Sequence, residues 1–236
     1  MTLDHLVYAT PDLDATAAEL ERLLGVRAAV GGRHPGLGTR NQLIGLGGRS
    51  YLEIIGPDPD QDPPIGPRPF GIDELTAAAL VSWAVAVDGI DAVVARARTL
   101  GYDPGDPQDM SRRTPAGDLL SWRLTPPQHI GHAGIVPFLI DWGSTRHPTE
   151  SGLPLVELVS LRIGHPDPEA ARKDLTAVGV TTIPTAKPHP DTSAARATPT
   201  AEPCRDVAAA RFGLALDTRP RLTAVLSGRC GHVMLS

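Results

Sequence analysis

The chain has 236 residues, of which 41% are hydrophobic and 21% are charged, and this balance predicts a globular protein with a full hydrophobic core. The net charge of −5 leaves no basic surface of the kind that neutralises phosphates, which argues against nucleic acid as a partner. No apolar stretch approaches membrane-spanning length, and two cysteines are too few for a disulfide-stapled secreted scaffold. We therefore expect a soluble protein of the reducing cytoplasm, with no membrane partner.

One sequence pattern occurs three times, beginning at Leu3, Leu80 and Leu158. In each copy a short apolar strand leads into an amphipathic helix, whose apolar residues recur at the three- and four-residue spacing of one helix face. The copies are too far apart for a solenoid repeat, and their spacing suits one supersecondary unit each. The repetition predicts a duplicated fold unit followed by a third copy.

Capping residues and glycines mark where the three predicted helices begin and end. A side-chain oxygen before the first turn can accept a hydrogen bond from an unpaired backbone N–H, and a glycine after the last turn tolerates the left-handed conformation. The expected starts are Asp12 or Thr10–Pro11, Asp88, and Asp167–Pro168, and the expected ends are Gly25, Gly101 and Gly179. The expected core faces are Leu13, Ala17, Leu20 and Leu24; Ile90, Val93, Val94, Ala97 and Leu100; and Ala171, Leu175 and Val178.

Short strand-like runs follow each helix, so each copy predicts one βαβββ module. A segment rich in proline and aspartate separates the first two copies, because such a segment cannot pair into a sheet. We expect a first module at 1–57, a connector at 58–78, a second module at 79–148, and a third, diverged module at 149–236 with a long loop at 183–203. Since strands outnumber helices, the predicted class is α+β.

Four motifs follow one another in the order HPGLGTRN (34–41), YLEIIGP (51–57), SRRTPAGDLLSWRL (111–124) and PFLIDW (137–142). Together with the repeated module, they resemble the glyoxalase-like branch of the vicinal oxygen chelate superfamily, the group of glyoxalases, bleomycin-resistance proteins and ring-cleaving dioxygenases. The resemblance implies that two modules pair into an open, cup-shaped β-barrel. It also implies a divalent metal ion on the floor of the cup, bound by side chains from the first and last strands of each module.

The third module has three possible roles. It caps the barrel, pairs with its counterpart in a homodimer, or replaces a module expected elsewhere. A disulfide between Cys204 and Cys230, both in this module, is an alternative to two free thiols.

His5 is the first candidate metal ligand. The two-residue period of a strand places Leu3, His5 and Val7 on one face and Asp4, Leu6 and Tyr8 on the other. If the second group covers the helix, His5 points into the cup, at the first metal-ligand position of the family. The alternative is a hydrogen-bonded histidine near a strand end.

Glu53 is the second candidate, as metal ligand and as catalytic base. It lies within YLEII, where the neighbours imply burial, and an unpaired buried carboxylate is costly. A metal ion, a basic partner or protonation would each offset that cost. The alternative is an exposed edge strand on which Glu53 faces water.

The other two ligand positions of the family are not filled by good ligands. Ser82 aligns with His5 and Ile140 with Glu53, and only a one-residue bulge would bring Asp141 into the latter position. His34, His132, His147 and Asp141 are further candidate ligands. We expect Thr39, Asn41, Arg123 and Ser82 to contact a substrate; for Arg123 an ion pair with Asp118 or another neighbour is equally ordinary, and Thr39 and Asn41 can simply close a turn.

Two functions are compatible with these residues. The resemblance implies a metal-assisted lyase or isomerase that acts on a small, oxygen-rich metabolite, with Glu53 removing a proton next to a carbonyl group. The second is a metal-free protein that binds and sequesters a small molecule, as bleomycin-resistance proteins do, which the residues at positions 82 and 140 favour.

Overall fold

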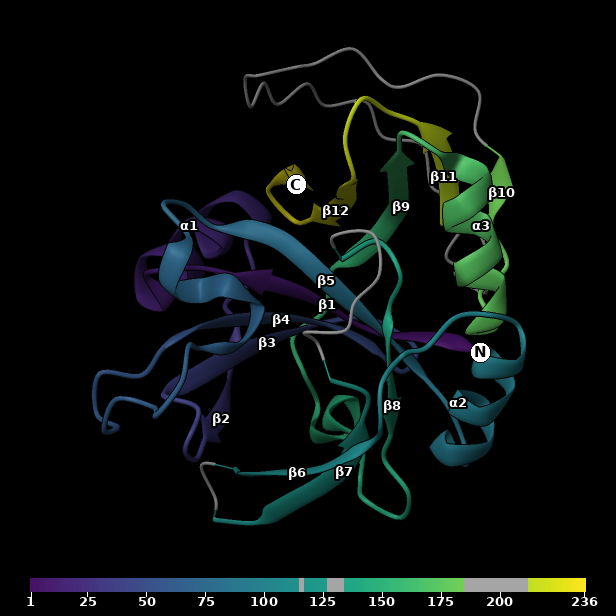
Figure 1. The fold of residues 1–236 in the computed structure, drawn as a ribbon. Coiled ribbons are helices and arrows are strands. Elements are labelled where there is room, and N and C mark those ends of the chain that lie inside the picture. Colours follow the sequence, from purple (N-terminus) through teal and green to yellow (C-terminus); the bar gives the residue numbers. More distant parts are fainter. Residues whose placement is uncertain (115–116, 127–133, 185–211) are drawn as a thin grey trace.

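The structure, a computed structural model, describes residues 1–114, 117–126, 134–184 and 212–236. Eight strands form a ring in the order β1-β4-β3-β2-β6-β7-β8-β5 (Figure 1). The N-terminal half supplies β1 (Thr2–Ala9), α1 (Leu13–Leu24), β2 (Ala29–His34), β3 (Thr39–Gly47) and β4 (Ser50–Pro57). The next half supplies β5 (Ala79–Ala86), α2 (Ile90–Thr99), β6 (Gln108–Arg113), β7 (Leu119–Leu124) and β8 (Phe138–Asp141). The predicted α+β fold of tandem βαβββ modules is confirmed.

The two halves meet at two seams. β1 pairs in parallel with β4 and antiparallel with β5, so the strand that carries His5 belongs to both halves. On the other side β2 and β6 pair at one position, Arg33 with Arg113. The cup that the family resemblance implied is therefore closed into a ring, and its second seam is narrow.

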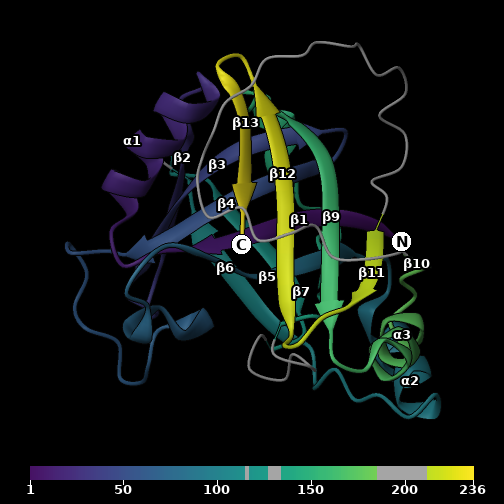
Figure 2. The same ribbon diagram turned by 90° about the horizontal axis from the view of Figure 1, so that it is seen from above.

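A second sheet lies across the outside of the barrel (Figure 2). Its strands are β9 (Glu157–His165), β10 (Ile183–Pro184), β11 (Phe212–Leu216), β12 (Arg221–Gly228) and β13 (Gly231–Leu235), and α3 (Pro168–Ala177) follows the first of them. The strand order is β10-β11-β9-β12-β13. Because β12 contacts β5, β9 contacts β3 and α1 contacts both β12 and β13, the third segment covers the barrel wall from outside.

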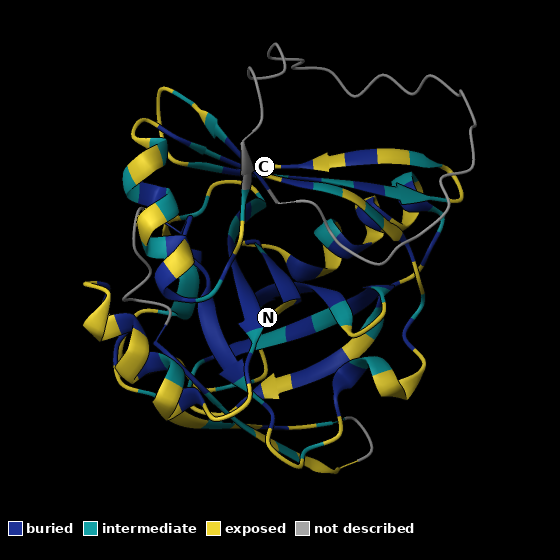
Figure 3. Ribbon diagram, turned by 90° about the vertical axis from the view of Figure 1, so that its right-hand side faces the viewer, coloured by how far each residue is buried: buried dark blue, intermediate teal, exposed yellow. Residues whose placement is uncertain are grey.

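The largest apolar core lies between the barrel and this second sheet. Leu6, Trp83 and Val85 of the barrel belong to the same buried cluster as Leu222 and Leu226 of β12. Figure 3 shows buried residues along the barrel strands and exposed residues on the outer faces of the helices. Each large apolar side chain that is buried in this way contributes about 1.5–3 kcal/mol, so the outer sheet is part of what stabilises the barrel.

Two of the three predicted helix caps are confirmed. Asp12 accepts a hydrogen bond from the backbone N–H of Ala15, and Asp167 accepts one from Ala170. The predicted cap at Asp88 is wrong. The N-cap residue of α2 is Gly89, with a φ of 71°, and no side chain at the N-cap accepts a hydrogen bond. Instead, Asp141 at the end of β8 accepts hydrogen bonds from the N–H groups of Gly89 and Ile90.

The predicted core faces of α1 and α3 are buried as expected. On α2, Ile90, Val94 and Ala97 are buried, whereas Val93 is only half-buried. Leu100 was expected in the core and is 46% exposed, because α2 ends at Thr99 and Leu100 is its C-cap residue, outside the helix face.

Further expectations concern membrane-spanning segments, the two cysteines and the predicted loops. Among the helices of the described segments, none combines the length and apolar character that a membrane span needs. Cys230 is exposed with a free thiol, whereas Cys204, His132 and most of the predicted loop at 183–203 lie outside the described residues.

Candidate functional site

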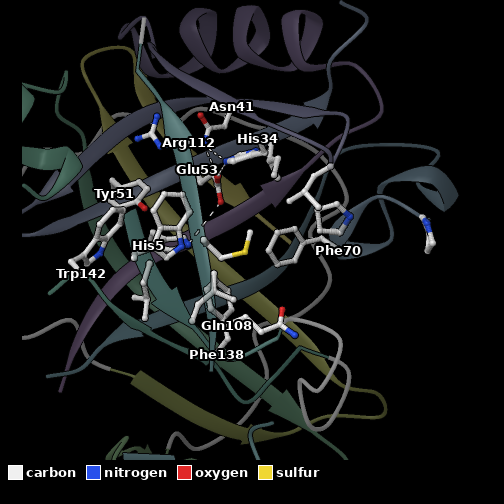
Figure 4. Close-up of a pocket in the computed structure, with 18 residues that line it drawn as sticks. His5, His34, Asn41, Tyr51, Glu53, Phe70, Gln108, Arg112, Phe138 and Trp142 are labelled. Carbon is white, nitrogen blue, oxygen red and sulfur yellow. Dashed lines mark hydrogen bonds and ion pairs between the residues drawn. The ribbon is translucent and has the colours of Figure 1, made fainter. Parts of the chain in front are cut away.

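The barrel contains a cavity of about 170 Å³ (Figure 4). Its apolar wall includes the aromatic residues Tyr51, Phe70, Trp122, Phe138 and Trp142. The polar side chains that line it are His5, His34, Asn41, Glu53, Gln108 and Arg112. A mostly apolar wall with a few convergent polar groups is typical of a small-molecule site.

His5 and Glu53 face each other in this cavity. The Nε2 atom of His5 lies 3.8 Å from Oε2 of Glu53. The side chains are buried, with His5 4% and Glu53 8% exposed. The alternative in which Glu53 faces water from an edge strand is excluded, because β4 lies between β1 and β3.

A bulge in β1 places Asp4 beside His5. The pairing of β1 with β5 shifts register between Leu3 and His5, so Asp4 is the extra residue. Strict alternation would have put Asp4 on the helix side and Leu3 with His5; in the structure Leu3 joins the outer core instead. That part of the strand prediction is wrong because a bulge resets the side-chain period.

Asp4 fixes the orientation of the His5 ring from behind. Its Oδ1 lies 2.6 Å from Nδ1 of His5, and its Oδ2 accepts a hydrogen bond from Trp142 Nε1 at 2.9 Å and lies 3.2 Å from Nε2 of His147. Burial raises the pKa of Asp4, but the hydrogen bonds from His147 and His5 outweigh it, and the pKa is lowered to about 2. With Nδ1 bound to a carboxylate, the His5 ring presents Nε2 to the cavity.

Two aromatic rings pack against His5. The Tyr51 ring stacks on it with centroids 4.8 Å apart, and the Phe138 ring meets it edge-on at 5.4 Å. Burial raises the pKa of Tyr51 well above its usual range, so its phenol stays neutral beside the carboxylates of Asp4 and Glu53. His5 is therefore fixed by packing as well as by its hydrogen bond.

Glu53 is held by a second polar group. Asn41 Nδ2 donates a hydrogen bond of 2.5 Å to Glu53 Oε1, and Nε2 of His34 lies 3.8 Å from the same oxygen. Thr39 lies 3.0 Å from Nδ1 of His34 and so supports that ring. Burial lowers the pKa of His34; the charge of Glu53 opposes this shift and that of Arg112 adds to it, which favours the neutral imidazole.

Two glycines in β2 make space for these side chains. A Cβ atom on Gly31 would lie 2.1 Å from Oδ1 of Asn41. A Cβ atom on Gly32 would lie 3.0 Å from Nη1 of Arg112 and 2.5 Å from the carbonyl oxygen of Arg113. Glycine in β2 thus lets Asn41 and Arg112 lie close to the backbone.

Sequence reasoning missed Arg112, which is 5% exposed and lines the cavity. The signal was the alternation in β6, since Gln108, Met110 and Arg112 all line the cavity. The resemblance directed attention to the first and last strands of each module, and β6 is neither.

Several predicted substrate contacts lie elsewhere. Arg123 lies outside the cavity, where it pairs with Asp91 and Asp109 on the surface. Ser82 is fully buried on β5 without lining the cavity, and its hydroxyl has no hydrogen-bond partner among the described residues. Thr39 is also buried behind the wall, so only Asn41 of the four predicted contacts reaches the cavity.

The donors present offer few ligands for a metal ion. Within the described part of the chain, no group of three or more His, Cys, Asp or Glu side chains is arranged to hold a metal. Of the further candidates that the structure describes, His147 is bound to Asp4, Asp141 caps α2, and only His34 lies near Glu53. His5 and Glu53 fit a cation only if water or substrate oxygens supply most of its ligands.

The connector also contributes to the wall. Pro67, Pro69 and Phe70 line the cavity, the last two within a short 3₁₀ segment, Pro69–Glu74. Phe70 has a φ of 61°, which is rare for a residue with a side chain and costs about 1–3 kcal/mol. Its ring contacts Phe138 with centroids 6.1 Å apart. The sequence suggested only a linker here.

Comparison with known families adds a match over most of the chain. The model of the glyoxalase-like domain family matches residues 3–179. No curated protein matches the chain.

Comparison with solved structures gives matches at low sequence identity. A hypothetical protein from Staphylococcus aureus is 12% identical with a TM-score of 0.61, and the alignment covers 100% of this chain and 98% of the other. Methylmalonyl-CoA epimerase from Mycobacterium tuberculosis is 18% identical with a TM-score of 0.41, covering 64% of this chain and 91% of the epimerase. The Streptomyces coelicolor epimerase, in complex with 2-nitronate-propionyl-CoA, is 21% identical with a TM-score of 0.42, covering 63% and 99%. The first of these extends the fold similarity to the C-terminal sheet.

Proposed function

The chain belongs to the glyoxalase-like domain family of the vicinal oxygen chelate superfamily, and from this premise we propose that it is a lyase- or isomerase-type enzyme acting on a small, oxygen-rich metabolite. The observation that carries the proposal is the 3.8 Å approach of His5 Nε2 to Glu53 Oε2 within a mostly apolar cavity. Two titratable groups at one wall can remove a proton from a bound molecule and return one to it.

Glu53 is the proposed general base. The hydrogen bond from Asn41 holds Oε1, so that Oε2 remains directed toward His5 and the cavity. A carboxylate fixed in this way can take a proton from a carbon atom next to a carbonyl group. The surrounding aromatic side chains limit access of water, which strengthens the electrostatic interactions of the site.

His5 is the proposed second group. Asp4 accepts the Nδ1–H of His5, so Nε2 is free to accept or deliver a proton at the cavity. The same carboxylate stabilises the ring when it becomes positively charged. The acceptor of a delivered proton would be the oxygen or carbon on which negative charge develops.

We also propose that His5 and Glu53 bind a divalent cation together with the substrate. Such a cation, when bound, would stabilise negative charge on a substrate oxygen. Two protein ligands and the nearby charge of Arg112 predict weak binding to the free protein.

Proton exchange tests the catalytic proposal. Wild-type protein is incubated in D₂O with a panel of small carbonyl compounds, and loss of the signal of the hydrogen next to the carbonyl is followed by ¹H NMR. We expect exchange on at least one compound, and a fall of at least about a hundredfold in Glu53→Gln. The control is Asp91→Asn, which removes a surface carboxylate outside the cavity. Exchange that Glu53→Gln leaves intact would refute the role of Glu53.

Metal binding is tested separately. Protein purified without a histidine tag is titrated with Mn²⁺, and free Mn²⁺ is measured by electron paramagnetic resonance. We expect binding that His5→Ala and Glu53→Gln both weaken, and that Asp91→Asn leaves unchanged. Equal binding by all four proteins would place any cation elsewhere.

A metal-free, ligand-sequestering protein is the second candidate function. It is favoured by Ile140, which lines the cavity at the position aligned with Glu53, and by the aromatic wall. This function predicts tight binding of an aromatic or apolar ligand without exchange or turnover. Exchange that depends on Glu53 would refute it.

A further inference from the structure

We propose that Arg112 is the anchor for a carboxylate group of the ligand, so that the cavity takes small monocarboxylates. The inference deepens the proposed function by naming a substrate class, and it rests on that function only for the identification of the cavity as the reactive site. The motif at 111–124 that carries the family resemblance begins in β6, but the resemblance implied no ligand-binding role for that strand.

The first observation is that Arg112 is buried without a partner. It is 5% exposed and lines the cavity. Among the described residues no acidic side chain forms an ion pair with it, and its Nη1 atom is buried without a hydrogen-bond partner. Other arginines of the same barrel, such as Arg33 and Arg123, are paired with aspartates.

The second observation is that the backbone accommodates the guanidinium. A Cβ atom on Gly32 would lie 3.0 Å from Nη1, so the guanidinium packs against the backbone of β2 at a position where the carbonyl oxygen of Arg113, at 2.5 Å from that Cβ, already requires a glycine. An arginine cannot lose its proton to escape the cost of burial. A buried, unpaired positive charge lowers stability, and such features persist where binding requires them.

The third observation concerns the charge of the ligand. Among the described residues that line the cavity, Glu53 is the only acidic one; it accepts a hydrogen bond from Asn41 and lies 3.8 Å from His5 Nε2, and it forms no ion pair with Arg112. One guanidinium balances one negative charge, and its planar fork matches a carboxylate. A second negative charge on the ligand would be repelled by Glu53, so a monocarboxylate fits better than a phosphate monoester.

This arrangement also orients the ligand. A carboxylate on Arg112 would leave the remainder of the molecule between the aromatic wall and the pair formed by His5 and Glu53. The ligand class is therefore a small acid with a second oxygen function, such as a 2-oxo or 2-hydroxy acid, or a short acid with an apolar tail.

The wild-type protein provides the first test. It is titrated in the presence of EDTA with acetate, pyruvate, phenylacetate and inorganic phosphate, and with phenylacetamide as the neutral match of phenylacetate; binding is followed by the fluorescence of Trp122 and Trp142, which line the cavity. We expect phenylacetate to bind at least about tenfold more tightly than phenylacetamide. Equal affinity, no binding of any carboxylate at millimolar concentration, or tighter binding of phosphate than of every carboxylate would overturn the proposal.

Variants provide the second test. We expect Arg112→Met to weaken phenylacetate binding at least about tenfold while leaving phenylacetamide unchanged, and Arg112→Lys to give an intermediate loss. The matched control is Arg113→Met, since Arg113 is exposed on the opposite face of β6 and should leave both affinities unchanged. Wild-type affinity for phenylacetate in Arg112→Met would overturn the proposal; if that variant does not fold, Arg112→Lys and the wild-type preference decide.

The two proposals fail in different ways. Glu53→Gln should bind phenylacetate as tightly as the wild type or more tightly, because a repelling charge is removed. Carboxylate binding through Arg112 without any Glu53-dependent proton exchange would refute the catalytic function and keep the anchor. Glu53-dependent proton exchange, together with wild-type affinity for phenylacetate in Arg112→Met, would refute the anchor and keep the function.

Discussion

Three side chains contact the carboxylate of Asp4. Its two oxygens contact His5, Trp142 and His147, and all of these groups are buried. A buried carboxylate surrounded by hydrogen-bond donors is stabilised as the anion. At the residue scale, Asp4 is thus the positioning residue behind His5, and the bulge in β1 is what brings it there.

The pH dependence of stability tests this role. The pKa of Asp4 falls from 3.8 to about 2 on folding. Because the folded pKa is the lower one, Asp4 contributes stability that is complete above the ordinary pKa and is lost as the pH falls toward the folded value; the contribution is on the order of 2 kcal/mol. We expect Asp4→Asn to be less stable than the wild type at about pH 7 and the difference to shrink below about pH 4. Urea unfolding at a series of pH values measures it, and a difference independent of pH would contradict the assignment.

Arg112 predicts the opposite effect on stability. Because its charge is buried without a partner, Arg112→Met should raise the free energy of unfolding of the ligand-free protein by about 1 kcal/mol or more. Arg113→Met should change it by less than about 0.5 kcal/mol, since Arg113 is exposed. Denaturant unfolding of the three proteins checks this; a strong loss of stability in Arg112→Met would show that the guanidinium has a structural role.

How far single residues can be predicted depends on what surrounds them. The burial of Glu53 was predictable because it lies within an apolar run. The orientation of His5 toward the cavity was predictable because the family resemblance marks its position. Asp4 was not, because a bulge leaves no trace in the alternation of polar and apolar residues. For Arg112 the alternation in β6 shows which residues share a face of the strand, but it does not show whether that face meets solvent or a cavity.

At the scale of elements, the start of α2 is capped by a residue that is distant in the sequence. Asp141 at the end of β8 binds the first N–H groups of the helix, so the cap is non-local. Periodicity predicted all three helices, since helix faces are a local property. It could not predict this cap, because the pairing of β8 with β5 decides which side chain reaches the helix start.

A pair of substitutions tests the capping. Asp141→Ala should lower the free energy of unfolding by about 0.5–2 kcal/mol, because two N–H groups lose their acceptor. Asp88→Ala should have little effect, since Asp88 makes no cap. Thermal unfolding followed by circular dichroism compares them, and an equal loss in both variants would contradict the structural assignment.

At the scale of the whole molecule, the outer sheet and the barrel share one core. Trp83 and Leu6 on the barrel belong to the same buried cluster as Leu226 on β12. The sequence suggested a third copy of the module without showing where it lies, because strand order and packing depend on contacts between distant segments. In the structure, the segment after β8 covers the barrel wall, and the cavity is formed by the first two copies and their connector.

One cooperative unfolding transition is the expected consequence. Leu226→Ala should lower the free energy of unfolding by about 2–5 kcal/mol, because it opens a void between the sheet and the barrel. Tryptophan fluorescence, which includes the cavity residues Trp122 and Trp142, and far-ultraviolet circular dichroism should shift together. Val225→Ala, at a half-buried neighbour, should cost less. If the midpoint of the fluorescence transition is unchanged in Leu226→Ala, the barrel folds independently of the outer sheet.

The connector has a consequence for divergence within the family. Pro67, Pro69 and Phe70 form part of the cavity wall although they belong to no barrel strand. Substitutions or length changes in such a segment disturb no strand pairing, so they are tolerated more readily than changes in the barrel strands. Homologues that retain His5 and Glu53 but differ in this segment would catalyse the same chemical step on different metabolites.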